Sequence, residues 1–370
     1  MVKESISPRQ LMIIVILNSI GTAILVIPAS VAADAKQDAW MPLLLSIGMG
    51  IILTILYMSV AKNFPASSLF DINDLVFGKW LGRLITMIIS LLTLIFGAQD
   101  VFYVGNFMVT QIMPSTPVQS INILFMVIVM MGAKLGTVVF LRTAEIFFPW
   151  LILLFILFMT MNIPNMELNN FLPIGEAAPL TILRPAIRIT CFTFITLFIT
   201  ITPILHQVSN IQRAKKGYLV GVVISGITLL LLVVSSVLVL GADTTAMQAF
   251  PSYALAQRIS IGNFLQRIEV VVAFLWLVSI YFKTSMYFHT TLKGLAHALQ
   301  LRDYKTICNP IGLIVIVLSL VVYPNEAFEQ KWDNHTYIPL ALILGIIYPL
   351  AILLIGWMRK GLSNKKSRHA

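Results

Sequence analysis

Conformationally unusual residues interrupt the first apolar run of the chain, between Asn18 and Pro28. Gly21, Thr22 and Ala23 come in the middle of this run, and Pro28 lacks a backbone N–H donor. Lipid offers no replacement partners, so backbone groups freed by a break must face protein, water or a ligand. We therefore expect Gly21, Thr22 and Ala23 to form part of a ligand site. The alternative is that small residues here only let another helix pack closely.

Threonines form a second candidate surface, in the run that ends at Pro203. Thr193, Thr196 and Thr200 are spaced three and four residues apart, so they share one helical face. Hydroxyl groups on this face, opposite the Gly21 interruption, could supply hydrogen bonds to a ligand. The alternative is that each hydroxyl bonds back to the carbonyl one turn earlier.

A carboxylate lies in the third apolar run. Asp100, Tyr103 and Asn106 share an approximate helical face. A charge at the centre of a bilayer costs about 2.5 to 3.5 kcal/mol on insertion scales, so such groups usually face a cavity or a partner. Asp100 is thus a candidate cation or proton site, or a partner for a ligand amine, and Tyr103 is a candidate ligand contact. The alternative is that the long helix places Asp100 near the headgroups.

Two charged residues, Arg267 and Glu269, lie near one end of the eighth run. Residues two apart diverge on a helix, so they should have different partners and a structural or coupling role. The sequence has no Walker loop, dinucleotide fingerprint, nucleophile with its base, or clustered metal ligands. It therefore indicates neither an enzyme nor a cofactor or metal site.

The composition is that of an integral membrane protein. The chain has 370 residues, of which 58% are hydrophobic and only 11% charged, whereas soluble domains carry roughly 25% charged residues. About 20 apolar residues cross the hydrocarbon core. We therefore predict an all-α protein with ten transmembrane helices, near 10–33, 41–61, 84–110, 118–137, 144–163, 185–208, 217–240, 265–288, 306–323 and 338–358.

Basic residues orient these spans. Nineteen of the 25 Lys and Arg residues, Lys283 among them, are expected on one side of the membrane and six on the other. The positive-inside bias therefore predicts that both termini are cytoplasmic. It also argues against nucleic-acid binding, because the basic residues lie in short loops between apolar runs. A segment with helical spacing, 292–302, is expected to lie on the inner membrane surface as an amphipathic helix.

Ten spans divide into five plus five within a single permease domain, 1–370. The second set must insert upside down, which is the inverted-repeat arrangement that binds substrate near the midplane between interrupted helices. Repeat 1 covers about 10–163 and repeat 2 about 185–358. The expected interruptions are in helices 1 and 6.

The chain resembles the endospore germination permeases, the B subunits of nutrient-sensing germinant receptors, within the amino acid, polyamine and organocation transporter superfamily. The resemblance covers nearly the whole length. It rests on four motifs in order: Gly21-Thr22-Ala23-Ile24-Leu25-Val26-Ile27-Pro28, Phe77-Gly78-Lys79-Trp80-Leu81-Gly82, Arg267-x-Glu269 with Trp276, and Tyr323-Pro324-Asn325-Glu326. It implies a LeuT-like fold, a small nutrient ligand such as an amino acid, assembly with germinant receptor A and C subunits, and the spore inner membrane of a Bacillus-type bacterium.

Two features depart from the pattern of these relatives. Thr196-Leu197-Phe198 stands where many have Gly-x-Glu in the sixth helix, and the fifth span lacks the lysine of some proton-coupled relatives.

The expected function is a nutrient-sensing subunit that binds its ligand between helices 1 and 6 and signals germination. The alternative is a proton- or cation-coupled amino acid transporter with Asp100 in the coupling site.

Overall fold

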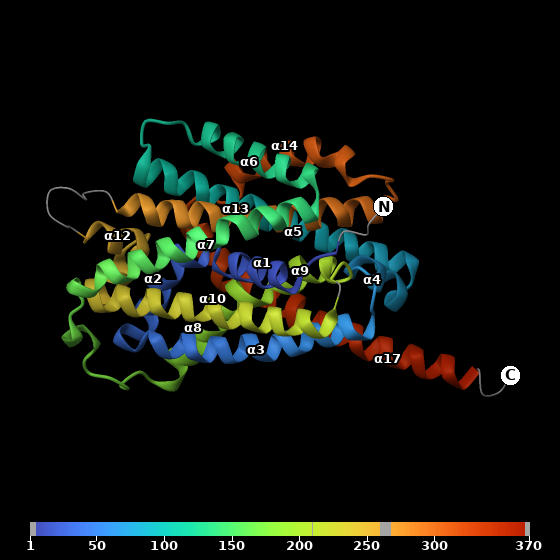
Figure 1. Ribbon diagram of the computed structural model, residues 1–370, viewed down its shortest axis with the longest axis horizontal. Coiled ribbons are helices and arrows are strands. Elements are labelled where there is room, and N and C mark those ends of the chain that lie inside the picture. Colours follow the sequence, from blue (N-terminus) through green and yellow to red (C-terminus); the bar gives the residue numbers. More distant parts are fainter. Residues whose placement is uncertain (1–4, 209, 260–267, 367–370) are drawn as a thin grey trace.

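Long helices build the molecule, and they run approximately along its long axis (Figure 1). The computed structural model describes residues 5–208, 210–259 and 268–366. Within these ranges nine helices are long and apolar enough to cross a membrane, and the count becomes ten when a bent pair is taken as one span. The prediction of an all-α membrane protein with ten spans is confirmed.

The bent pair is the first span. α1 (Pro8–Ile20) and α2 (Ala23–Ala35) meet at an angle of 49°, and the break falls at Gly21 and Thr22. Ser7 begins α1 with a capping box, in which its hydroxyl accepts from the Gln10 N–H. The predicted interruption of helix 1 is therefore confirmed in position.

The sixth span is interrupted in a different way. α8 (Pro179–Thr190) continues through a π-helical stretch, Cys191–Ile195, and a turn at Thr196 before α9 (Leu197–Leu205) begins. A π-helical stretch shifts the hydrogen-bond register and is frequent at functional sites. The remaining spans are α3 (Trp40–Asn63), α5 (Lys79–Phe107), α6 (Val118–Leu135), α7 (Thr137–Asn162), α10 (Ile211–Leu240), α13 (Glu269–Ala298), α14 (Cys308–Val321) and the series α15 (Glu326–Lys331), η7 (Trp332–Tyr337), α16 (Ile338–Leu342), η8 (Ile343–Ile347) and α17 (Tyr348–Lys366).

Three shorter helices cover the ends of the bundle. α4 (Leu69–Phe77) lies at the end from which α17 projects, and α12 (Pro251–Gln257) lies at the opposite end (Figure 1). α11 (Ala242–Met247) packs against α2. Both α11 and α12 follow α10 along the chain.

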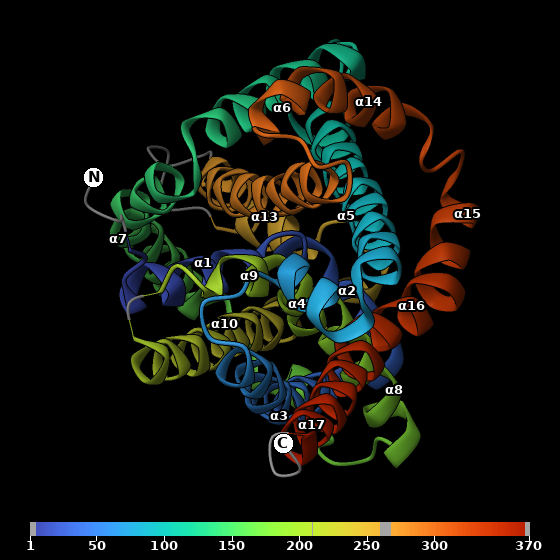
Figure 2. The ribbon, with the colours of Figure 1, turned by 90° about the vertical axis from the view of Figure 1, so that its right-hand side faces the viewer.

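The two broken spans occupy the centre of the bundle. α1 packs against α10 and α13, and viewed along the bundle α1 and α9 lie inside a surround that includes α5, α13, α10 and α3, while α6, α14 and α17 lie at the periphery (Figure 2). α9 is buried along its whole length. Any ligand that reaches the two breaks is therefore enclosed by protein and not by lipid.

α13 differs from the sequence prediction. It continues without a break to Ala298, so the expected separate surface helix over 292–302 is wrong. Leu292, Leu295 and Ala296 are buried, and a side chain at Gly294 would collide with Ser90 on α5. The apolar stripe of this segment faces the protein, which is why the same helical spacing was misassigned to the membrane surface.

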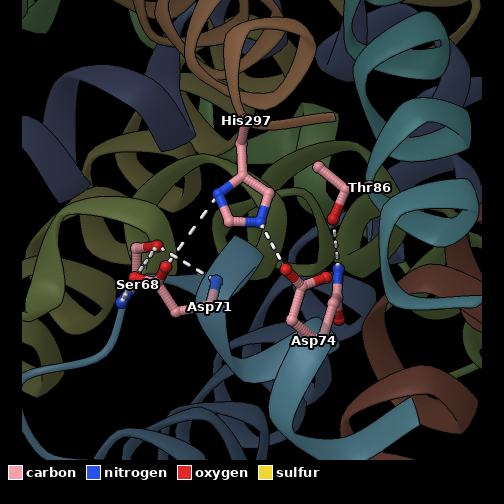
Figure 3. A network of polar contacts seen from close by, with 6 residues as sticks. Ser68, Asp71, Asp74, Thr86 and His297 are labelled. Atoms are coloured by element: carbon pink, nitrogen blue, oxygen red, sulfur yellow. Dashed lines mark hydrogen bonds and ion pairs between the residues drawn. The ribbon is translucent and has the colours of Figure 1, made fainter. Parts of the chain in front are cut away.

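A polar network ties α4 to the far end of α13 (Figure 3). His297 Nε2 lies 3.0 Å from an oxygen of Asp74, and its Nδ1 lies 3.9 Å from Asp71. Asp71 also completes a capping box with Ser68 at the start of α4. These contacts hold α4 across the end of the bundle.

We predict that Gly82→Ala destabilises the protein by about 1 to 3 kcal/mol, as overpacking usually does. A Cβ at Gly82, on α5, would lie 2.6 Å from the Asn73 carbonyl oxygen and 2.7 Å from the Asp74 nitrogen of α4, and both are backbone atoms. Gly48→Ala, on the exposed side of α3, is the matched control, because its Cβ would have no atom within 4 Å. The measurement is the melting temperature in detergent, and equal values for the two variants would contradict the packing.

Candidate functional site

The hydroxyl of Thr22 joins three helices at the break in the first span. Thr22 Oγ1 donates to Asp100 Oδ1 on α5 at 2.7 Å, and it accepts from Lys283 Nζ on α13 at 3.1 Å. Thr284 Oγ1 donates to the other Asp100 oxygen at 3.4 Å. All four side chains are buried. We call Thr22, Asp100, Lys283 and Thr284 the central cluster.

The absence of a side chain at Gly21 makes this cluster possible. A Cβ at Gly21 would collide with Cδ of Lys283 and would lie 3.1 Å from its Cβ. The lysine stem therefore crosses the break directly over Gly21. The sequence suggested either a ligand role or close helix packing for this glycine, and the structure shows close approach of a charged side chain from α13.

Opposite charges compensate each other inside the cluster. Asp100 and Lys283 are each only 4% exposed. A buried charge that lacks a partner costs several kcal/mol, and here the Thr22 hydroxyl accepts from the cation and donates to the anion. Asp100 thus lies buried inside the bundle beside the break.

Several buried polar atoms near the breaks have no hydrogen-bond partner within the described ranges. They include both amide atoms of Asn18, Gln99 Nε2 and Thr196 Oγ1. Buried polar groups are nearly always paired, so unpaired ones indicate a place for water or a ligand. Asn18 lies one turn before the break and Gln99 precedes Asp100, so these atoms come from the three elements that meet at the centre.

The three predicted threonines of the sixth span differ in their bonding. Thr193 Oγ1 donates to the Ile189 carbonyl at 2.6 Å and Thr200 Oγ1 to the Thr196 carbonyl at 3.0 Å. Both follow the pattern in which the hydroxyl bonds back to its own helix. The hydroxyl of Thr196 makes no such bond, and Tyr287 on α13 is close enough to interact with it. Of the three, Thr196 has the hydroxyl that a ligand could use.

Two cavities adjoin the break. The inner cavity, about 30 Å³, is lined by Thr22, Gln99, Asp100, Lys283 and Tyr287, among others. The larger one, about 320 Å³, is lined by α2, α8, the segment after α11, α15 and η7. We call it the α2 vestibule. Thr22 borders both cavities, so the two spaces meet at the break.

An aromatic and acidic layer lies between the two cavities. Tyr103 and Asp333 border both, and Tyr103 Oη donates to Asp333 Oδ2 at 3.4 Å. Tyr323 Oη donates to the other Asp333 oxygen at 3.3 Å, and Phe192 stacks on Tyr337 with ring centroids 4.4 Å apart. Movement of these side chains would join the vestibule to the inner cavity.

The remaining candidate residues lie away from the central cluster. Ala23 lines the α2 vestibule. Glu269 is the first residue of α13, whereas Arg267 lies outside the described residues. In the described ranges no three His, Cys, Asp or Glu side chains gather as metal ligands would.

Lys283 is the member of the central cluster that the sequence analysis missed. It was assigned to a membrane face because the eighth span was expected to end at 288, but α13 extends to Ala298 and Lys283 lies in its middle. The uninterrupted helical pattern from Glu269 to Leu295 could have revealed this. Asp333 was missed because 324–337 read as a connection between spans, whereas it continues as helix into the tenth span.

We predict that Thr22→Val lowers the free energy of unfolding by about 1 to 3 kcal/mol, the usual cost of leaving buried polar partners unpaired. Valine keeps the shape of threonine but removes the atom that contacts Asp100 and Lys283. Thr22→Ser restores the hydroxyl and should recover most of the loss. Thermal unfolding of both variants in detergent measures this, and equal stability of the serine and valine variants would show that the bridge contributes nothing.

Comparison with known proteins places this geometry in a family. The family described as "Spore germination protein" matches residues 5–327. Spore germination protein KB of Bacillus subtilis (strain 168) is 26% identical over 378 residues and covers all of both chains. Putative spore germination protein YfkT of the same strain is 25% identical over 346 residues, covering 92% of this chain and 93% of its own.

Solved transporter structures share the fold. Mhp1, a nucleobase-cation-symport-1 family transporter in a closed conformation with bromovinylhydantoin bound, superimposes with a TM-score of 0.73 at 13% identity, covering 93% of this chain and 78% of its own. MhsT in complex with L-phenylalanine gives a TM-score of 0.67 at 14% identity, covering 94% and 97%. The LeuT-like fold is therefore confirmed. The chain is a multi-pass membrane protein that belongs to the spore germination protein family of permease-like proteins.

Proposed function

We propose that this protein is the nutrient-sensing, permease-like subunit of a spore germinant receptor. The observation that carries the proposal is the broken first helix, whose Thr22 hydroxyl contacts two buried ionisable side chains, Asp100 and Lys283, and borders two cavities. Buried polar atoms without a hydrogen-bond partner are found on Asn18, one turn before this break, on Gln99, which lines the inner cavity, and on Thr196 at the break of the sixth span. Membership of the germination family supplies the biological context.

A small ligand would bind between the breaks of the first and sixth spans. Thr22 and Thr196 would contact it, and Gly21 and Ala23 would expose backbone groups to it. The central cluster contains one cation and one anion, so it suits an uncharged or zwitterionic ligand, of which an amino acid is the leading class. The inner cavity of about 30 Å³ is smaller than such a ligand, so binding must enlarge it.

The need for enlargement connects binding to signalling. A ligand shifts a conformational equilibrium only by its differential affinity for the two states. A ligand that binds only the expanded centre favours that arrangement of the bundle. The shift would pass to germinant receptor A and C subunits and promote germination. We place the protein in the spore inner membrane with both termini cytoplasmic. The excess of Lys and Arg residues that predicts this orientation remains when Lys283, which lies inside α13, is left out of the count.

A proton- or cation-coupled amino acid transporter is the second candidate. The observation that favours it is the buried pair of Asp100 and Lys283 beside the helix break. Ionisable residues inside membrane helices often belong to ion or proton pathways. Uptake of labelled amino acids into proteoliposomes driven by an ion gradient would support this candidate, and a nutrient response without uptake would support the sensor.

We predict that spores carrying Thr196→Val need about fivefold more nutrient for the same germination rate, because a ligand hydrogen bond is worth about 1 kcal/mol. Thr193→Val and Thr200→Val are the matched controls, since both hydroxyls already bond to their own helix. The measurement is germination across a panel of amino acids, sugars and nucleosides.

Protein abundance in the spore membrane, followed by immunoblot, separates binding from stability. An unchanged response of the Thr196→Val spores at normal abundance would contradict the proposed contact. Equal losses in all three variants would also contradict it, because they would indicate a general effect on packing.

A further inference from the structure

The α2 vestibule has the size of a ligand site, whereas the inner cavity does not. Its volume is about 320 Å³, compared with about 30 Å³ for the inner cavity. Small-molecule pockets usually measure about 300 to 1,000 Å³, and a single buried water already needs about 10 to 15 Å³. In this conformation a nutrient-sized molecule therefore fits in the vestibule and not at the centre.

Small side chains on one face of α2 create the space. The small residues Ala23, Ser30 and Ala33 line the wall together with the larger Ile27, at helical spacing of three and four residues. This wall is narrow and largely apolar. The groups that could orient a polar ligand come from the other walls.

Arg188 on α8 provides a positive charge in the wall of the α2 vestibule. Arg188 Nη1 donates to Asp34 Oδ2 on α2 at 3.0 Å, while its buried Nε has no partner. A guanidinium has five N–H donors in a planar fork that suits carboxylates. One bond to Asp34 therefore leaves Arg188 with donors for a ligand carboxylate.

Two carboxyl groups lie in the wall of the α2 vestibule that α15 and η7 form. Glu329 and Asp333, one helical turn apart on α15 and η7, both line the vestibule. Both Asp333 oxygens accept hydrogen bonds, Oδ2 from Tyr103 and Oδ1 from Tyr323. The cavity thus presents a guanidinium and two carboxylates from different elements, which is the charge pattern that complements a ligand bearing both an ammonium and a carboxylate.

We propose that the α2 vestibule is a second binding site, separate from the centre, for a zwitterionic ligand of amino-acid size. Arg188 binds the carboxylate, and Asp333 with Glu329 binds the ammonium. The bound ligand then contacts the layer of Tyr103, Asp333 and the Phe192–Tyr337 stack. This layer lies between the vestibule and the central cluster. This assignment concerns binding alone, so it does not depend on the germination role.

The test is ligand binding to the purified full-length protein in detergent. The probes are the twenty standard L-amino acids, tested singly for a rise in melting temperature. Each amino acid that stabilises the protein is then compared with its carboxamide, which lacks the carboxylate, and with the corresponding acid that lacks the α-amino group. We expect stabilisation by at least one amino acid and a loss of tenfold or more in affinity for both analogues.

Variants locate the bound molecule. We expect Arg188→Met to weaken binding tenfold or more, while Arg184→Met, one turn earlier on the exposed face of α8, leaves it unchanged. Asp34→Asn is the control for loss of the Arg188–Asp34 ion pair. This variant keeps Arg188, so we expect it to bind the ligand as the native protein does. Thr196→Val should also leave vestibule binding intact, since Thr196 does not line this cavity.

Three outcomes would overturn the proposal. Native-like affinity of Arg188→Met, with loss in Thr196→Val, would assign the ligand to the centre and leave the proposed function standing. Equal affinity for the carboxamide would exclude the carboxylate contact. Stabilisation by none of the amino acids would exclude a zwitterion site, whereas a germination response to sugars or nucleosides would still support the sensor.

Discussion

The hydroxyl group of Thr22 is the contact on which the centre of this protein depends. It accepts from Lys283 and donates to Asp100, so one oxygen atom links the broken first span to α13 and α5. Gly21 is required beside it, because the lysine stem occupies the space where a side chain would lie. The break, the Asp100–Thr22–Lys283 bridge and the close approach of the helices thus form one structural feature.

This arrangement makes the centre both compact and polar. The inner cavity measures about 30 Å³, Gln99 with its unpaired Nε2 lines it, and a larger vestibule adjoins it. The layer of Tyr103, Phe192 and Asp333 lines both spaces. A ligand that enters from the vestibule must therefore move this layer and loosen the central contacts, which connects occupancy to the conformation of the bundle. A sensor and a transporter would both use such a device.

The sequence predicted the architecture well because its signals are local. Apolar runs of about 20 residues define spans, and Gly21 with Thr22 marked the break that the structure shows. The sequence predicted less of the site, because the site depends on which faces meet. Asp100 was recognised as a buried charge, but its partner Lys283 was not, since nothing within the sequence of α13 shows that it crosses Gly21. Among the threonines, the shared helical face concealed a difference that only the carbonyl positions reveal: Thr193 and Thr200 bond to their own helix and Thr196 does not.

The most direct test of this account is a double-mutant cycle on stability with Lys283→Met and Asp100→Asn. Residues in one polar network show coupling energies of about 0.5 to 3 kcal/mol, whereas independent sites add within about 0.5 kcal/mol. The free energies of unfolding of the native protein, both single variants and the double variant would be measured in detergent. We predict a coupling above about 1 kcal/mol, with the double variant more stable than the two single losses imply. Additive losses would contradict the account, because Lys283 and Asp100 would then act independently and Thr22 would not connect them.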